Sequence, residues 1–99
     1  MTQEEITKRI SVTPTIVCFT EFIVHAAETG EEETVSLDEF YEVSNDSKGN
    51  VWVTYSTGND DMPHDSFMVT ETVEEVREIV KAARRMQMEM FDKYKNIKL

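Results

Sequence analysis

The sequence predicts an α+β domain, in which an antiparallel meander of about four strands is followed by one long C-terminal α-helix. Two observations support this class. Up to residue 69, segments in which apolar and polar residues alternate are separated by turn-forming stretches. From residue 73 onward, apolar residues recur at helical spacing without a glycine or proline. No change in composition divides the 99 residues, so a single domain over residues 1–99 is expected.

A short N-terminal helix is expected over about residues 3–9. Thr2, with Glu5 three residues on, has the form of a capping box, in which a hydroxyl and a carboxylate bind free amides of the first turn. The helix should end before Thr13, because a residue that precedes a proline disfavours the helical conformation.

The strands are expected to follow this helix. Residues 15–27 favour β-structure and are apolar on both faces in the middle, as in a central strand. Residues 28–33 (ETGEEE) combine a turn glycine with four glutamates and should form an exposed hairpin tip. The remaining strands are predicted at residues 34–43, with a bend at 38–39, and at residues 51–55 and 66–70.

The C-terminal helix is the most regular part of the sequence. Thr72, with Glu75 three residues on, forms a second capping box, and the helix is predicted from Val73 to about Lys95. At 100° per residue its apolar side chains form one stripe, flanked by Val73 and Phe91. The stripe consists of Val76, Ile79, Val80, Ala83, Met86, Met90 and Tyr94.

Charge excludes some classes of partner. The chain has 20 acidic and 10 basic residues, a net charge of −10, and six of the bases follow residue 80. A field of this sign repels nucleic acid, so direct nucleic-acid binding is not expected. No apolar run approaches the roughly 20 residues that span a bilayer. One cysteine, Cys18, and no signal-like N-terminal segment predict a cytoplasmic protein.

The motifs SLDEF, NVWVTYSTG and FMVTETVEEV follow one another through the middle half of the chain. In this order they resemble the small flagellar FlbD-type proteins and similar short phage-encoded domains. The resemblance implies a small sheet closed by a helix and no enzymatic activity. This chain differs in its acidic hairpin and its long basic helix end. The matching residues are Leu37, Asp38, Val43, Val51, Val53, Gly58, Val69, Glu71, Thr72, Glu74, Glu75 and Val76.

No catalytic or metal-binding constellation is evident, so a non-enzymatic protein without a cofactor is predicted. Cys18 and His25 are seven residues apart, over about 20 Å along one strand at ~3.3 Å per residue, and a thiol–imidazole pair is not expected. A loop that is rich in carboxylates matches neither a calcium loop nor a zinc spacing. Its residues are Asp60, Asp61, His64 and Asp65.

The acidic residues suggest the main functional hypothesis. Spaced carboxylates can imitate the phosphates of DNA and occupy a basic site on a partner, although solubility alone would also explain them. On this hypothesis the protein is a phage-encoded inhibitor of a host defence or nucleic-acid-handling protein, acting in the host cytoplasm. The predicted contact residues are Glu28, Glu31, Glu32, Glu33, Glu39, Glu42, Asp60 and Asp61.

The long helix suggests two further hypotheses. Arg77, Lys81, Arg84 and Lys95 fall within a sector of about 60°, either as a solvated flank with local ion pairs or as a site for a phosphorylated nucleotide signal. For the nucleotide the predicted contacts are Trp52, Lys81, Arg84 and Arg85. A flagellar accessory or regulatory role is the alternative that the resemblance implies.

The apolar stripe is longer than a four-stranded sheet can cover. Methionine suits an adaptable contact surface, so the end of the helix is predicted to join two copies as a homodimer, with ordinary core packing as the alternative. The predicted interface residues are Met86, Met90, Phe91 and Tyr94.

Overall fold

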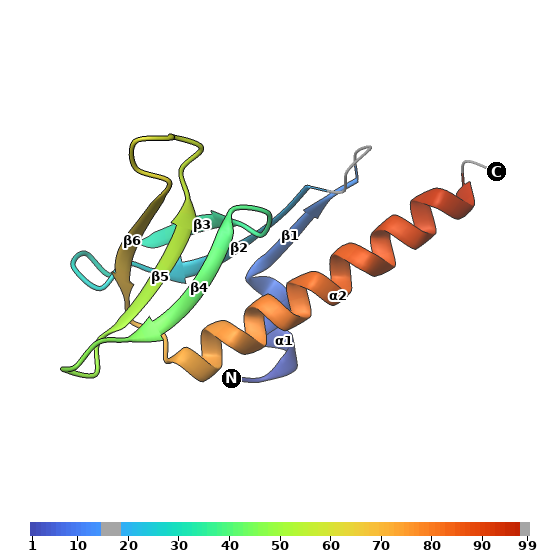
Figure 1. Ribbon diagram of the computed structural model, residues 1–99. Helices are drawn as coiled ribbons and strands as arrows, with labels where there is room; N and C mark the ends of the chain where they lie inside the picture. Colours follow the sequence, from blue (N-terminus) through green and yellow to red (C-terminus); the bar gives the residue numbers. More distant parts are fainter. Residues whose placement is uncertain (15–18, 98–99) are drawn as a thin grey trace.

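Two three-stranded antiparallel sheets and two helices make up the fold (Figure 1). The computed structural model describes residues 1–14 and 19–97. The sheet orders are β1-β2-β3 and β4-β5-β6. The elements are α1 (Gln3–Lys8), β1 (Ile10–Thr13), β2 (Phe19–His25), β3 (Glu32–Ser36), β4 (Phe40–Asn45), β5 (Val51–Ser56), β6 (His64–Val69) and α2 (Val73–Ile97). The α+β class is confirmed, and the predicted number of strands is corrected from about four to six.

Two local features account for the additional strands. The β-branched residues between α1 and Pro14 form β1, which pairs with β2 from Ile10 opposite Phe22 to Thr13 opposite Phe19. The predicted second strand is divided at residues 37–39, and its halves, β3 and β4, belong to different sheets. The bend was predicted at this position, whereas the change of sheet was not.

The two sheets are joined at two corners. At one corner the chain passes from β3 to β4 through residues 37–39, where the Leu37 amide donates to the Thr20 carbonyl of β2 at 2.9 Å and the Ser56 amide of β5 donates to the Glu39 carbonyl at 2.7 Å. At the other, an isolated bridge joins Ala26 to Val69. Between these corners β3 and β6 have only one strand neighbour each, so each presents an edge.

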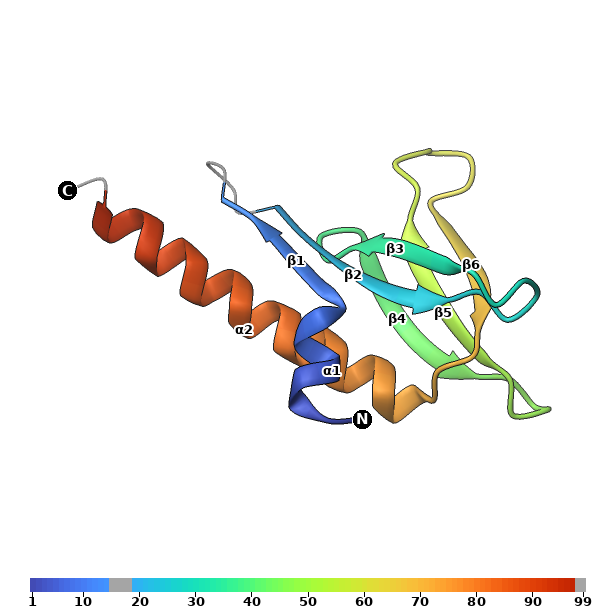
Figure 2. The same ribbon diagram turned by 180° about the vertical axis from the view of Figure 1, so that it is seen from behind.

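Helix α2 supports both sheets. It packs against β1, β2 and β4, and α1 contacts it (Figures 1 and 2). Across the core, Phe22 of the first sheet meets Phe40 of the second edge to face, with 5.8 Å between ring centroids. Helix α1 contributes Ile6 to the core, and α2 contributes Val73, Val76, Ile79, Val80, Ala82 and Ala83. The predicted stripe is thus confirmed as the core face over its first three turns.

The last turns of α2 extend beyond the sheets (Figures 1 and 2). Met86 and Met90 are half-buried, whereas Met88 is 67% and Phe91 46% exposed. The predicted contact of Tyr94 lies outside the described side chains. Neither helix in the described part of the chain combines the length and the apolar composition needed to cross a membrane.

Candidate binding grooves

A groove of about 760 Å³ lies where the two sheets face each other across the edge of β3. One wall comes from the β2–β3 hairpin and includes residues 33–36; the other comes from β5 and β6 and includes residues 66–68. Among the residues that the structure describes, none of those that line the groove is a lysine, arginine or histidine. Five are carboxylates: Glu21, Glu28, Glu31, Glu33 and Glu39.

Aromatic rings contribute the apolar part of this acidic groove. Tyr55 and Phe67 meet edge to face, with 6.1 Å between ring centroids, and Phe19 and Trp52 also line the groove. The face of an aromatic ring carries negative electrostatic potential and attracts a cation, most of all a guanidinium group. The rings and the carboxylates therefore favour the same kind of ligand.

The turn at residues 45–50 holds the ring of Trp52. Asp46 accepts hydrogen bonds from the Lys48 and Asn50 amides at 2.8 and 3.0 Å, and the Trp52 indole N–H donates to Asp46 Oδ2 at 2.9 Å. The indole N–H is the main reason that the pKa of Asp46 lies below its ordinary value. Trp52 consequently has a fixed orientation beside the groove.

The pKa of Tyr55 is affected by the negative charges around the groove. Its pKa is raised, first by burial and then by negative charge. The nearest charge is Asp65, whose Oδ2 accepts the Tyr55 hydroxyl at 3.4 Å, and Glu39 and Glu33 add to the effect. Two carboxylates of the groove, Glu39 and Glu33, thus help to raise the pKa of Tyr55 without a hydrogen bond to its hydroxyl.

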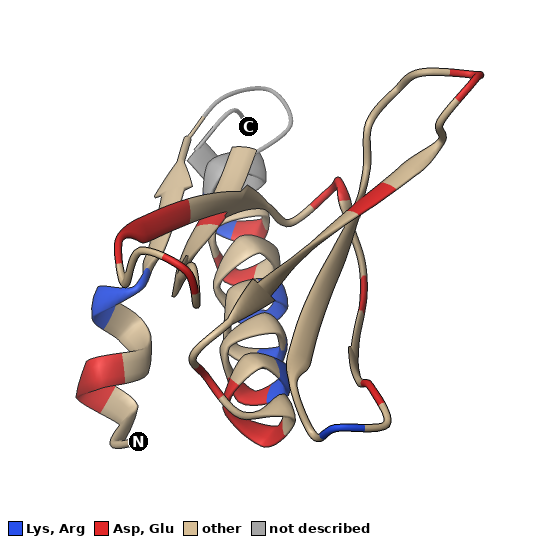
Figure 3. Cartoon of the chain, turned by 90° about the vertical axis from the view of Figure 1, so that its left-hand side faces the viewer, with Lys and Arg blue, Asp and Glu red and all other residues tan. Residues whose placement is uncertain are grey.

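The groove gathers half of the predicted acidic residues. Glu28, Glu31, Glu33 and Glu39 line it, and the other four are exposed elsewhere: Glu32, Glu42, Asp60 and Asp61. Acidic segments lie on both sheets and their loops in Figure 3, whereas basic ones concentrate on the helices. The sequence analysis did not select Glu21, although it is the only acidic residue in the apolar segment 15–27.

A second, shallower groove of about 430 Å³ lies between β4 and α2. Arg77, Lys81 and Arg84 line one side. The other side includes the rings of Phe40 and Tyr41 and one carboxylate, Glu42, so the three bases exceed the acids in this groove. Among the described residues, no carboxylate lies within 4.0 Å of the charged groups of these three bases. The positive charge is therefore available to a ligand.

The predicted nucleotide contacts are not all in one place. Lys81 and Arg84 line the basic groove, but Trp52 lines the acidic one. Arg85 lies outside both grooves, where its Nε is 4.0 Å from Glu89 Oε1. In place of Trp52, the aromatic rings beside the bases are those of Phe40 and Tyr41. Tyr41 is 59% exposed, although its ring already lies 4.3 Å, centroid to centroid, from that of His64.

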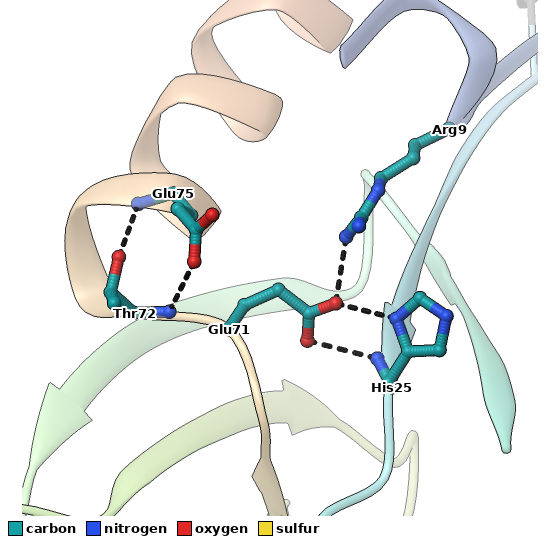
Figure 4. Close-up of polar contacts among 5 residues, drawn as sticks. All are labelled: Arg9, His25, Glu71, Thr72 and Glu75. Carbon is teal, nitrogen blue, oxygen red and sulfur yellow. Dashed lines mark hydrogen bonds and ion pairs between the residues drawn. The ribbon is translucent and has the colours of Figure 1, made fainter. Parts of the chain in front are cut away.

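Glu71 forms a polar junction that the sequence analysis missed (Figure 4). Its side chain is 4% exposed. Oε2 accepts from Arg9 at 2.7 Å and lies 2.6 Å from His25 Nδ1, while Oε1 accepts from the His25 amide at 2.9 Å. Burial would raise the pKa of Glu71, but the bonds from His25 and Arg9 outweigh it, and the pKa is lowered. The junction thus joins the start of α2 to β2 and to the end of α1.

The neighbouring residues support the same junction. Thr72 and Glu75 form the predicted capping box, with the Glu75 amide 3.1 Å from Thr72 Oγ1 and the Thr72 amide 2.9 Å from Glu75 Oε1 (Figure 4).

His25 is engaged with Glu71, and its hypothetical partner Cys18 lies outside the described residues. Over residues 1–14 and 19–97, no three His, Cys, Asp or Glu side chains gather as a metal site.

Comparison with known proteins gives no match to a protein-family model, a curated protein or a solved structure. The resemblance to flagellar FlbD-type proteins therefore stays a prediction. The functional argument depends on the two grooves and their opposite charges.

Proposed function

We propose that this chain is a non-enzymatic interaction protein that holds a cationic segment of a partner protein in its acidic groove. The observation that supports this most directly is the composition of one concavity, in which five carboxylates and four aromatic rings occur without a basic residue. Carboxylates pair with lysine and arginine, and aromatic faces stack on guanidinium groups. An apolar ligand or an anion would match this lining poorly.

Such a protein acts by occupying its partner. A basic site that normally contacts phosphates would be blocked, because the carboxylates compete for the same arginine and lysine side chains. The net charge of −10 would also speed the encounter with a basic surface. These properties fit a phage-encoded inhibitor of a host defence or nucleic-acid-handling protein.

The test measures peptide binding through the fluorescence of Trp52, the single tryptophan, which lines the groove. The probe is a decapeptide of alternating arginine and valine, and its glutamate–valine counterpart is the negative control. We expect saturable binding of the cationic peptide that weakens by about tenfold or more between 50 and 500 mM NaCl, because salt screens exposed charges.

Two variants with equal charge change locate the site. Glu31→Lys combined with Glu33→Lys changes two carboxylates of the groove, whereas Asp60→Lys combined with Asp61→Lys makes the same change on an exposed loop outside it. The first pair should abolish peptide binding and the second should weaken it only slightly. Equal affinity of the two double variants, or affinity that does not depend on salt, would exclude the proposal.

The basic groove favours a second candidate function, the binding of a phosphorylated nucleotide. Arg77, Lys81 and Arg84 could pair with phosphates while the exposed ring of Tyr41 stacks on a base. A thermal-shift screen of linear and cyclic nucleotides tests this function, with Arg84→Gln as the matched variant and Arg85→Gln as the control. Absence of stabilisation by every nucleotide would remove this candidate.

A further inference from the structure

We infer that the occupant of the acidic groove binds as an added β-strand along the edge of β3. The inference rests on the proposed function, because it specifies how the cationic segment is held. Its basis is the backbone of β3, independent of the carboxylate side chains that define the groove.

The hydrogen-bond pattern of β3 determines which backbone groups face the groove. In an antiparallel pair, alternate residues direct both their amide and their carbonyl toward the neighbouring strand. The bond from the Leu37 amide to the Thr20 carbonyl sets this alternation, so every second residue back from Leu37 faces β2. Thr34 and Ser36 consequently direct their backbone groups away from β2, and both residues line the groove.

These outward groups are available to a new strand. The Ser36 carbonyl accepts the Glu39 amide at 3.1 Å, but within the described part of the chain the amide of Ser36 and both backbone groups of Thr34 have no partner. Thr34 is exposed. An open edge with alternating donors and acceptors is what an extended peptide uses when it adds to a sheet.

The opposite wall of the groove also has an edge strand, β6, but part of its outward backbone is already bonded. On β6 the Met68 carbonyl already accepts the Ala27 amide at 2.8 Å, and the Ser66 amide donates to Asp65 Oδ1 at 2.8 Å. Strand β6 therefore has an interrupted series of outward backbone groups, and it also offers side chains, among them the ring of Phe67. This difference assigns backbone pairing to β3 and side-chain contact to β6.

Charge selects which strand can bind. Glu32 and Glu33 lie on β3, and Glu31 precedes them, so a second copy of β3 at this edge would bring like charges together. Charged residues on edge strands commonly prevent such self-association. A strand with arginine or lysine at alternate positions would place cations beside the carboxylates instead. At about 3.3 Å per residue, the five residues of β3 would pair with a segment of about five residues.

Two substitutions at one position separate backbone pairing from side-chain contact. Thr34→Pro removes the outward amide without removing a bond to β2, whereas Thr34→Ala removes only the side chain beyond Cβ. With the alternating arginine–valine decapeptide as the probe, Thr34→Ala should bind within about twofold of the unchanged protein. Thr34→Pro should bind about fivefold to tenfold more weakly, the usual effect of one lost hydrogen bond.

The binding of N-methylated peptides tests backbone pairing even if Thr34→Pro fails to fold. N-methylation of the arginines or of the valines blocks the amides of one face of the peptide strand, so one of the two methylated peptides should lose affinity and the other should retain it. Hydrogen exchange at the Thr34 and Ser36 amides should also slow when the unmodified peptide binds.

The outcomes distinguish this inference from the proposed function. If both methylated peptides bind equally and exchange at Thr34 is unchanged, while Glu31→Lys with Glu33→Lys still abolishes binding, strand addition is wrong and the proposed function stands. Equal losses in Thr34→Ala and Thr34→Pro would likewise contradict strand addition. If the unmodified peptide does not bind at all, both are wrong.

Discussion

Replacing Glu71 with glutamine should destabilise the fold, because this carboxylate holds the start of α2 against β2. The substitution keeps the shape of the side chain but removes its charge from the contacts with Arg9 and His25. A broken buried ion pair costs about 3–5 kcal/mol, but the side chains of Arg9 and His25 are 25% and 29% exposed, and solvent screens part of this. We therefore expect a loss of about 2 kcal/mol, or about 10 °C in Tm for a domain of this size.

The lowered pKa of Glu71 determines how the loss of stability should depend on pH. The pKa of Glu71 is lower in the folded protein than its ordinary value, so its stabilising contribution is complete above that ordinary value and disappears as the pH falls through the folded value. Urea unfolding should thus show the largest difference between the unchanged protein and Glu71→Gln near pH 7, and this difference should shrink as the pH falls below the ordinary pKa of a glutamate. Glu74→Gln, an equal charge change on an exposed neighbour, is the control. A loss no larger than that of Glu74→Gln, or one that does not shrink as the pH falls into the acid range, would refute the reasoning.

Three further predictions concern other parts of the molecule. Thr72→Ala removes the helix cap and should cost about 1 kcal/mol in urea unfolding; no loss would mean that the cap is dispensable. Glu39→Gln should lower the raised pKa of Tyr55, measured by NMR titration of its ring; an unchanged value would argue against the potential inferred in the groove. Light scattering should give a dimer mass at micromolar concentration and a monomer mass for Met90→Glu with Phe91→Glu; a monomeric unchanged protein would contradict the predicted interface.

Elements determined by neighbouring residues could be predicted from the sequence. Both capping boxes involve residues three apart, and α1 and α2 begin where these boxes place them. The division of the predicted second strand into β3 and β4, in contrast, was not determined by neighbouring residues alone. The turn at residues 37–39 could be predicted locally, but the partner of each half depends on pairing with β2 or β5, which lie far from the turn in sequence.

The residues of the candidate sites also divide into those that the local sequence predicts and those that depend on tertiary contacts. The glutamates of the hairpin tip could be selected from composition, whereas their position beside Tyr55 requires the two sheets to meet. Glu71 was named only among the residues that carry the FlbD-type resemblance, yet its partners His25 and Arg9 are 46 and 62 residues away in sequence. A buried carboxylate of this kind has no local pattern, because only tertiary contacts offset the cost of its burial.

The acidic groove should make the protein respond to salt in two opposite ways. Like charges at Glu31, Glu33 and Glu39 repel one another in the free protein, and added salt screens this repulsion. Salt should therefore raise the Tm of the free protein while it weakens the complex with a cationic peptide. Binding of the peptide in turn should raise the Tm most at low salt, because it supplies the missing positive charge as well as its own binding energy. If salt lowered the Tm of the free protein, ion pairs such as that of Arg9 with Glu71 would outweigh the repulsion. In that case, the repulsion among the groove carboxylates would not be what a bound cationic ligand relieves.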